Sequence, residues 1–367
     1  MADVIVSGHI CLDLLPGMAR VSQEDLGTPG RLYEVDPLGM ATGGAVSNTG
    51  LALFHLGVDV GLMGTVGDDL LGRVIIAYLR DQKPELADYI KVQPGQDSSY
   101  SVVLAPENAD RTFLHCTGTN DTFGAEDVDY TRLTDAKIFH LGYPPLMPRL
   151  YQNEGAELVD IFRRAKATGV VTSLDMAMPD PNGPSGKADW RRIVERTLPY
   201  VDIFLPSIEE ILMMMRLSAE RARAAMGELN LSFLDRLSHE LIDMGAAVVG
   251  FKLGPYGLYA RATDDADRLQ ALKRLPIDQA AWCGASAYYP TYAVEAVGTT
   301  GAGDTAYAGF LTALLHGLTL QEAVQMANAV GACSVEVATS TGGVRSWEET
   351  RARMASGWPL STERIKG

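Results

Sequence analysis

The chain has 367 residues, of which 47% are hydrophobic and 21% are charged, and its formal net charge is −15. This length suffices for one large domain with an appendage or for two domains, and the composition is that of a globular protein with a sizeable core. The acidic charge argues against nucleic acid or an anionic membrane as the main partner.

Cysteine spacing and the N-terminal residues bear on the compartment. The four cysteines lie far apart and lack the spacing of metal ligands, which predicts reduced thiols. Residues 1–6 lack a basic segment followed by a long apolar one, and the sequence has no run of 18 apolar residues. We therefore expect neither a signal peptide nor a transmembrane helix, and a cytoplasmic protein.

Short apolar runs alternate with segments of helical spacing along most of the chain. The predicted strands, in chain order, are residues 4–6, 60–66, 138–141, 170–174, 203–205 and 248–252. The predicted helices are residues 45–56, 70–80, 154–168, 188–198, 208–216, 303–316 and 320–338. This alternation predicts a parallel sheet with helices on both faces.

Two stretches do not fit that sheet. Residues 14–42 are rich in Gly, Pro and acidic side chains, which predicts short strands and turns outside it. Residues 98–104 and 111–116 alternate between apolar and polar side chains and have the features of a hairpin. No linker separates two independent domains, so we predict one domain over residues 1–367.

A turn of small residues opens the helix predicted at residues 303–316. Gly301, Ala302 and Gly303 precede Asp304, and the first amides of a helix have no intrahelical partner. An anion can therefore sit against this backbone, with the carboxylate of Asp304 beside it. Such a carboxylate could accept the proton of a hydroxyl that attacks phosphorus, or it could simply cap its own helix.

Polar residues also follow the first strand and open the first predicted helix. Asp13 lies just beyond the first strand, where it could bind a polyol or cap its own turn. Gly43 and Gly44 would let a ligand approach the backbone, and Asn48 offers both a donor and an acceptor one turn later. The alternative is an ordinary helix start with packing glycines.

Two later strand ends carry charged side chains. Glu210 opens a helix, where it could help hold a metal or simply benefit from the helix dipole. Lys252 could meet a phosphate or be solvated, and the turn containing Gly254 and Gly257 could lie against a nucleotide. A P-loop and a Gly-x-Gly-x-x-Gly motif after the first strand are both absent, which disfavours a P-loop NTPase and a typical nicotinamide enzyme.

Taken in order, these motifs resemble the ribokinase-like, or PfkB-type, sugar kinase family. The two specific segments are Gly43-Gly44-Ala45-x-x-Asn48 through His55-Leu56-Gly57, and Thr300-Gly301-Ala302-Gly303-Asp304-Thr305. Supporting matches are Val66-Gly67-Asp68-Asp69-x-x-Gly72, Arg111-Thr112-Phe113 and Gly118-Thr119-Asn120-Asp121. The resemblance runs over nearly the whole chain.

The resemblance implies a three-layer α/β domain with a mostly parallel central sheet and a small β lid from about 14–42 and 96–121. It also implies a kinase that uses ATP and Mg²⁺ to phosphorylate a sugar hydroxyl. The residue roles that it implies are Asp304 as base; the amides of Gly301, Ala302 and Gly303 as an anion hole; Asp13, Gly43, Gly44 and Asn48 for the sugar; Lys252, Gly254, Gly257 and Asn328 for the nucleotide; and Glu210 for magnesium and its waters.

The chain departs from the family pattern at two positions. Gly298 stands where the family usually has an Asp that in many members helps bind a monovalent cation, so a potassium requirement is in doubt. Ser207 stands where Asn is usual, which weakens the assignment of Glu210 to the metal.

Two other functions remain open. A nucleoside kinase of the same fold needs an apolar wall for the base, and the lid segments offer Tyr33, Tyr100, Phe113 and His115. A non-catalytic regulator that binds sugar or nucleotide is the second. The identity of the sugar, the hydroxyl used and the oligomeric state, including a homodimer through the lid, are not specified by the sequence.

Overall fold

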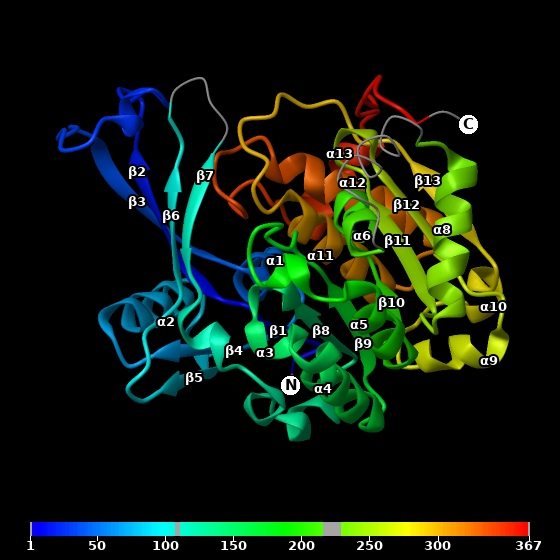
Figure 1. The fold of residues 1–367 in the computed structure, drawn as a ribbon. Helices are drawn as coiled ribbons and strands as arrows, with labels where there is room; N and C mark the ends of the chain where they lie inside the picture. Colours follow the sequence, from blue (N-terminus) through cyan, green and yellow to red (C-terminus); the bar gives the residue numbers. More distant parts are fainter. Residues whose placement is uncertain (1, 107–110, 216–228, 366–367) are drawn as a thin grey trace.

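The computed structural model describes residues 2–106, 111–215 and 229–365. Its main sheet has nine strands in the order β13-β12-β11-β10-β9-β8-β1-β4-β5 (Figure 1). The strands are β1 (Val4–Gly8), β4 (Val60–Gly67), β5 (Tyr89–Gln93), β8 (Ile138–Gly142), β9 (Val171–Asp175), β10 (Ile203–Phe204), β11 (Val248–Lys252), β12 (Leu258–Ala262) and β13 (Ser286–Tyr289). Neighbours from β5 to β11 pair in parallel, whereas β11–β12 and β12–β13 are antiparallel.

Helices cover both faces of the main sheet. Along β1, Val4 and Val6 join one apolar core and Ile5 joins the other, as expected for a strand buried on both faces. The first core includes residues of α1 (Ala45–His55), α2 (Leu70–Gln82), α9 (Ala266–Leu269), α10 (Gln279–Trp282), α11 (Ala302–Leu315), α12 (Leu320–Ser334) and α13 (Trp347–Ala355). The second includes residues of α3 (Pro148–Tyr151), α4 (Ala156–Ala167), α5 (Trp190–Thr197), α6 (Ile208–Met214) and α8 (Leu231–Asp243). The predicted three-layer fold class is confirmed.

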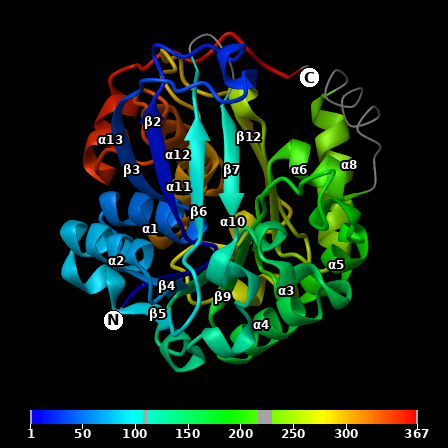
Figure 2. The same ribbon diagram turned by 60° about the vertical axis from the view of Figure 1, so that its left-hand side comes forward.

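A second sheet of four strands stands beside the main one, and we call it the lid (Figure 2). Its strands, in the order β3-β2-β6-β7, are β2 (Cys11–Gly17), β3 (Asp36–Gly43), β6 (Tyr100–Leu104) and β7 (Thr112–Cys116). Strands β6 and β7 pair antiparallel, as the hairpin pattern predicts, and β2 joins them by pairing in parallel with β6.

The chain passes from β1 into the lid, and from β3 of the lid into α1, with almost no linker. Only His9 and Ile10 separate β1 from β2, and Gly8 has a φ of +116°. The return from β3 into α1 goes through Gly44, whose φ of +84° favours glycine. The amide of Val46 donates to the carbonyl of His9 at 3.1 Å, which ties the start of α1 to the β1–β2 junction.

Some elements differ from the sequence expectations. The predictions omit β5, β12 and β13, which lie at or next to the edges of the sheet and lack the continuous apolar runs of central strands. They also omit α8. The last long helix ends at Ser334 rather than residue 338, since the carbonyl of Val335 accepts the amides of Val297 and Gly298. The helix predicted to reach Arg216 ends at Met214, and Arg216 lies outside the described residues. Within those residues, the helices are all too short or too polar to cross a membrane.

Candidate active site

The carboxyl ends of parallel strands of the main sheet supply most of the charged and polar groups of the candidate site. Asp175 ends β9, Lys252 ends β11, and Tyr143 directly follows β8. The start of α11, at Gly301 and Asp304, faces the same region. Ligands of open α/β sheets bind at this edge, so the topology alone brings these residues together.

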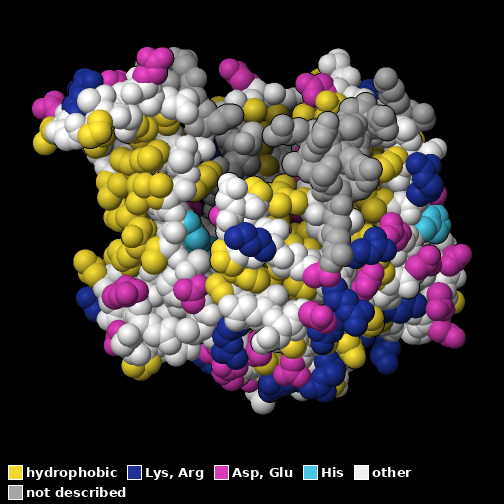
Figure 3. All heavy atoms as spheres, viewed as in Figure 1, with side chains coloured by type: hydrophobic (Ala, Val, Ile, Leu, Met, Phe, Trp, Pro, Cys, Tyr) yellow, Lys and Arg dark blue, Asp and Glu magenta, His cyan; other side chains and the backbone are white. Residues whose placement is uncertain are grey.

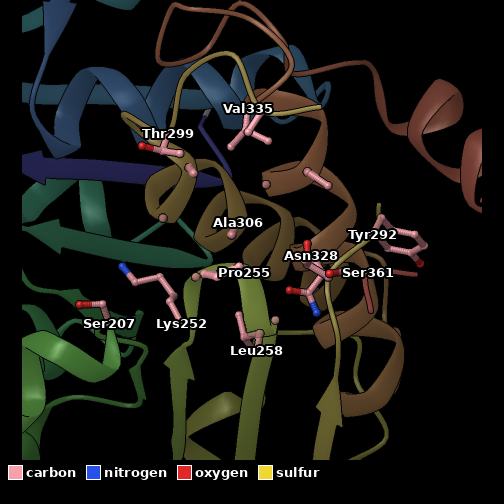
Figure 4. Close-up of a pocket in the computed structure, with 18 of the residues that line it drawn as sticks. Ser207, Lys252, Pro255, Leu258, Tyr292, Thr299, Ala306, Asn328, Val335 and Ser361 are labelled. Carbon is pink, nitrogen blue, oxygen red and sulfur yellow. The ribbon is translucent and has the colours of Figure 1, made fainter. Parts of the chain in front are cut away.

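A cavity of about 850 Å³ opens beside these groups, which is within the range of small-molecule sites. In Figure 4, Lys252 and Ser207 lie at one end of it, and Asn328, Tyr292 and Ser361 lie toward the other. Its lining includes nine of the site residues named in the sequence analysis, namely Glu210, Lys252, Gly254, Gly257, Gly301, Ala302, Gly303, Asp304 and Asn328.

Asp304 is held by elements other than its own helix. Its side chain is 2% exposed and accepts hydrogen bonds from Asn48 Nδ2 at 3.2 Å, Thr49 Oγ1 at 3.3 Å and Tyr143 Oη at 2.6 Å. The N-cap of α11 is Gly301, with a φ of +77°. These bonds aim the carboxylate away from its helix amides, so the simple capping interpretation does not describe it. Burial raises the pKa of Asp304, although Lys252 and the donated hydrogen bonds offset part of that rise.

Lys252 brings a positive charge to the start of α11. Its Nζ lies 2.6 and 2.7 Å from the two carboxylate oxygens of the fully buried Asp175. A Cβ built on Gly303 would lie 3.4 Å from the same Nζ, so the ammonium group sits against the small-residue turn. Burial lowers the pKa of Lys252, but attraction to Asp175, Glu210 and Asp304 outweighs it, and the net shift is upward. The lysine therefore stays charged at neutral pH.

Glu210 belongs to a capping box at the start of α6. Its Oε2 accepts the amide of Ser207 at 2.7 Å, and Ser207 Oγ accepts the amide of Glu210 at 3.3 Å. Both residues also line the cavity. Among the described residues, groups of three or more His, Cys, Asp or Glu side chains arranged for a metal are absent. A magnesium ion here would therefore have to take most of its ligands from phosphates and water, as Mg²⁺ commonly does in kinases.

Two of the other residues expected around the nucleotide, Gly257 and Asn328, meet at the end of β13. Gly257 has a φ of +100°, and a side chain on it would collide with the carbonyl of Tyr289. Asn328 on α12 donates through Nδ2 to that same carbonyl at 2.8 Å. Asn328 thus anchors the end of β13, and the glycine-containing turn lies against the same strand.

Asp13 lies on the lid face that turns toward the main domain. Cys11 Sγ donates to Asp13 Oδ1 at 3.4 Å, and Asp13 pairs in register with Ser101 of β6. A side chain on Gly43 would collide with the Asp13 carboxylate, so the glycine lets the carboxylate rest against β3. Burial raises the pKa of Asp13 to about 6.

Two histidines join the lid to the main domain. His9 Nε2 lies 3.3 Å from His115 Nε2, and His115 Nδ1 lies 3.0 Å from Ser101 Oγ. Burial lowers the pKa of His9 to about 3 and also lowers that of His115, so both rings are neutral at pH 7. The buried His9 Nδ1 and Asn48 Oδ1 have no hydrogen-bond partner among the described residues. Buried polar atoms left in this way favour a ligand with hydroxyl groups.

Sequence reasoning missed several of these groups. Asp175 directly follows the predicted strand 170–174, and its place at a strand end was the available signal. Tyr143 also follows a predicted strand, but its left-handed backbone, with a φ of +69°, cannot be inferred from the sequence. The pairing of His9 with His115 joins residues 106 positions apart and depends on how the lid is docked.

Comparisons with known proteins agree with this geometry. The family model described as "pfkB family carbohydrate kinase" matches residues 1–347. The chain is 25% identical over 343 residues to the probable fructokinase-6 of Arabidopsis thaliana, covering 91% of this chain and 77% of that protein. It is 25% identical over 332 residues to the ATP-dependent ribose-1-phosphate kinase of Halopiger xanaduensis, covering 90% and 91%.

Solved structures show the same fold. Arabidopsis thaliana ribokinase, solved with ribose and ATP, superposes with a TM-score of 0.69 at 18% identity, covering 96% of this chain and 98% of that one. The match of the family model covers most of the chain, and the motifs at both ends of the site fall within it. The chain therefore belongs to the pfkB family of carbohydrate kinases and is an ATP-dependent phosphotransferase.

Proposed function

We propose that the protein transfers the γ-phosphoryl group of Mg-ATP to a hydroxyl of a small sugar, with Asp304 as the general base. The observation that carries the proposal is the placement of the Asp304 carboxylate, which lines the cavity beside Gly301 and Gly303. Phosphoryl transfer needs alignment of the reacting groups and neutralisation of charge more than covalent help. A fixed carboxylate, a turn rich in free amides and one ammonium group fit those needs.

In this proposal the amides of Gly301 and Gly303 receive the phosphoryl oxygens. The amide of Ala302 already donates to the carbonyl of Thr299 at 3.2 Å, so it contributes chiefly by closing the turn. Lys252 adds positive charge on the same side. Donors of this kind are worth about 3–4 kcal/mol each in related oxyanion sites.

Asp13, Gly43, Gly44 and Asn48 are proposed to hold the acceptor, with His9 and His115 beside them. ATP and Mg²⁺ are the proposed cofactors, and Glu210 would help to hold the metal and its waters. Gly298 removes the carboxylate that a monovalent cation would need, so we expect equal turnover in potassium and tetramethylammonium buffers. A cytoplasmic location stays a prediction.

A panel of acceptors with coupled detection of ADP tests the proposal. The panel contains fructose and ribose as neutral sugars, ribose 1-phosphate as an anionic one, and adenosine as a nucleoside. Two carboxylates, Asp13 and Asp304, and two neutral histidines on the acceptor side favour a neutral sugar. ADP release with none of the panel, despite thermal stabilisation by ATP, would support the non-catalytic alternative instead.

One observation keeps the nucleoside alternative in view. Phe113 and His115 are two residues apart on β7 and therefore share a face, so Phe113 also turns toward the main domain. Its side chain is 49% exposed. Phe113→Ala should leave fructose or ribose turnover nearly unchanged, whereas a nucleoside kinase should lose acceptor affinity because the base would lose its apolar wall.

The opposite face of the lid supports a homodimer. Leu38, Met40 and Leu114 point outward from β3 and β7 and are 54%, 52% and 55% exposed, and Figure 3 shows apolar side chains gathered over these strands. Exposed apolar sheet faces of this kind mark interaction surfaces. We propose that a second copy of the lid covers it. Leu38→Glu together with Met40→Glu should give a monomer in sedimentation, and an unchanged mass would refute the pairing.

A further inference from the structure

The tip of the lid makes a contact with the phosphate-binding turn that the proposed function leaves unexplained. Arg111, just before β7, donates through Nη1 to the hydroxyl of Thr300, 189 residues later in the chain. The neighbours of Thr300 on both sides, Thr299 and Gly301, line the cavity. The lid is thus bonded directly to the segment that precedes α11, at a point far from the histidine pair.

Gly298 makes this approach feasible. A Cβ built on Gly298 would lie 3.1 Å from Arg111 Nη2, and equally close to the backbone of Val337 and Ala338. A larger side chain would have to displace either the guanidinium group or that backbone. Because Gly298 has no side chain, the Arg111 guanidinium group can pack directly against its backbone.

The charges around the cavity explain why a cation here matters. Its described lining contains the carboxylates of Glu209, Glu210, Asp304 and Glu363, and Lys252 is the only lysine or arginine among those lining residues. Lys252 itself is paired with Asp175. A triphosphate entering this region meets more negative than positive side-chain charge, and a guanidinium group beside the turn reduces that imbalance.

We propose that Arg111 is a positioning residue that couples the docked lid to the turn formed by residues 299–303. Its guanidinium group fixes Thr300, and through it the amides of Gly301 and Gly303, in the arrangement that binds the transferred phosphoryl group. It also adds positive charge next to that turn. This inference rests on the proposed function, and it predicts that the turn is fully ordered only while the lid is docked.

Activity measurements on four variants test the coupling. We expect Arg111→Ala to lower kcat about 10- to 100-fold, the loss typical of a hydrogen bond to a charged group, with little change in the KM of the acceptor. Arg111→Lys should recover part of the loss, since it keeps the charge but not the planar fork. Thr300→Val removes the hydrogen bond but keeps the charge, so its loss should not exceed that of Arg111→Ala, and the double variant should be no worse than Arg111→Ala alone.

The matched control is Arg20→Ala, which removes another lid arginine. Arg20 is 73% exposed and pairs with Asp36 within the lid, so its loss should leave kcat within about twofold of the wild type. Multiplicative losses in the Arg111→Ala, Thr300→Val double variant would overturn the proposal. So would equal behaviour of the Arg111 and Arg20 variants.

A second readout is independent of turnover. Hydrogen exchange of the peptide covering residues 298–304 is measured with Mg²⁺ and the non-hydrolysable analogue AMP-PNP on the full chain. Arg111→Ala and Thr300→Val should speed exchange of these amides at least about fivefold, while Arg20→Ala should not. Unchanged exchange in Arg111→Ala would refute the coupling, whereas a wild type that turns over no acceptor would refute the proposed function alone.

Discussion

The two sides of the site are built differently. On the nucleotide side, Lys252, Asp175 and the start of α11 project from strands and a helix that are buried in the main cores. On the acceptor side, Asp13, Ser101 and His115 project from a four-stranded lid whose outer face is apolar and exposed. The proposed base Asp304 belongs to the main domain rather than the lid, because its three hydrogen-bond donors come from α1 and the residue after β8. In the proposed function, groups of the main domain therefore carry out the chemistry, and the lid contributes to recognition of the acceptor.

The strongest test of that division is Asp304→Asn. Loss of a general base typically lowers the rate by about 10²–10⁴-fold, and we expect a fall in kcat of that size. The melting temperature should not fall, because burial raises the pKa of Asp304 and the neutral amide avoids the cost of a buried charge. Stopped-assay kinetics and thermal melts of the wild type and the variant measure kcat and the melting temperature. Near-normal turnover would place the base elsewhere.

Lys252→Met removes the positive charge on the nucleotide side of the site. We expect kcat/KM to fall about 10²–10³-fold, as for loss of an oxyanion donor, and stability to fall by about 3–5 kcal/mol because Asp175 is left buried and unpaired.

The double variant Lys252→Met, Asp175→Asn separates those two effects. Because it removes both charges of the pair, its urea midpoint should return toward the wild type while kcat/KM stays low. Recovery of activity together with stability would mean that Lys252 matters only for the fold.

Asp13→Asn tests the lid side, where the pKa of the carboxyl is raised to about 6. In the wild type, ionised Asp13 accepts hydrogen bonds from hydroxyls, so the KM of the acceptor should rise by up to about tenfold as the pH falls from about 7 to about 5. The Asp13→Asn variant should show a high KM with no such pH dependence.

Ionisation of Asp13 favours acceptor binding but lowers the stability of the fold. A carboxyl whose pKa is raised on folding contributes most below its unfolded pKa, and that contribution is lost as the pH rises through about 6. Asp13→Asn should therefore be no less stable than the wild type at about pH 8. A destabilised variant at that pH would contradict burial as the cause of the shift.

Tyr143→Phe should have the smallest effect. The phenol donates to Asp304 Oδ2 at 2.6 Å and thereby lowers the carboxyl pKa. Without it, kcat should fall about tenfold, as for loss of a hydrogen bond to a charged group, and the acid limb of the kcat profile should move to higher pH. Tyr78→Phe on α2 is the matched control. A fall in kcat with no movement of the acid limb would assign Tyr143 a purely structural role.

The same division separates what the sequence could and could not predict. The strand–helix alternation predicts the main sheet, because central strands are long apolar runs, and the two glycine motifs predict both ends of the site. The sequence pattern does not predict the antiparallel strands β12 and β13, since Arg261 interrupts the apolar residues of β12, and β13 has only four residues, of which Ser286 is exposed. The sequence also does not predict the contacts between the lid and the main domain. The pairs His9–His115 and Arg111–Thr300 depend on docking geometry that no local pattern encodes.

The two-residue passage from β1 into β2 has a consequence for engineering. Because Gly8 and Gly44 are the points at which the β2–β3 part of the lid leaves and rejoins the main domain, these two strands cannot be excised or exchanged as a cassette without cutting through His9 and the start of α1. Swapping acceptor preference between relatives would thus require grafting that junction along with the strands. A chimera joined within the lid strands would combine foreign strands with the original His9 and Gly44 at the junction.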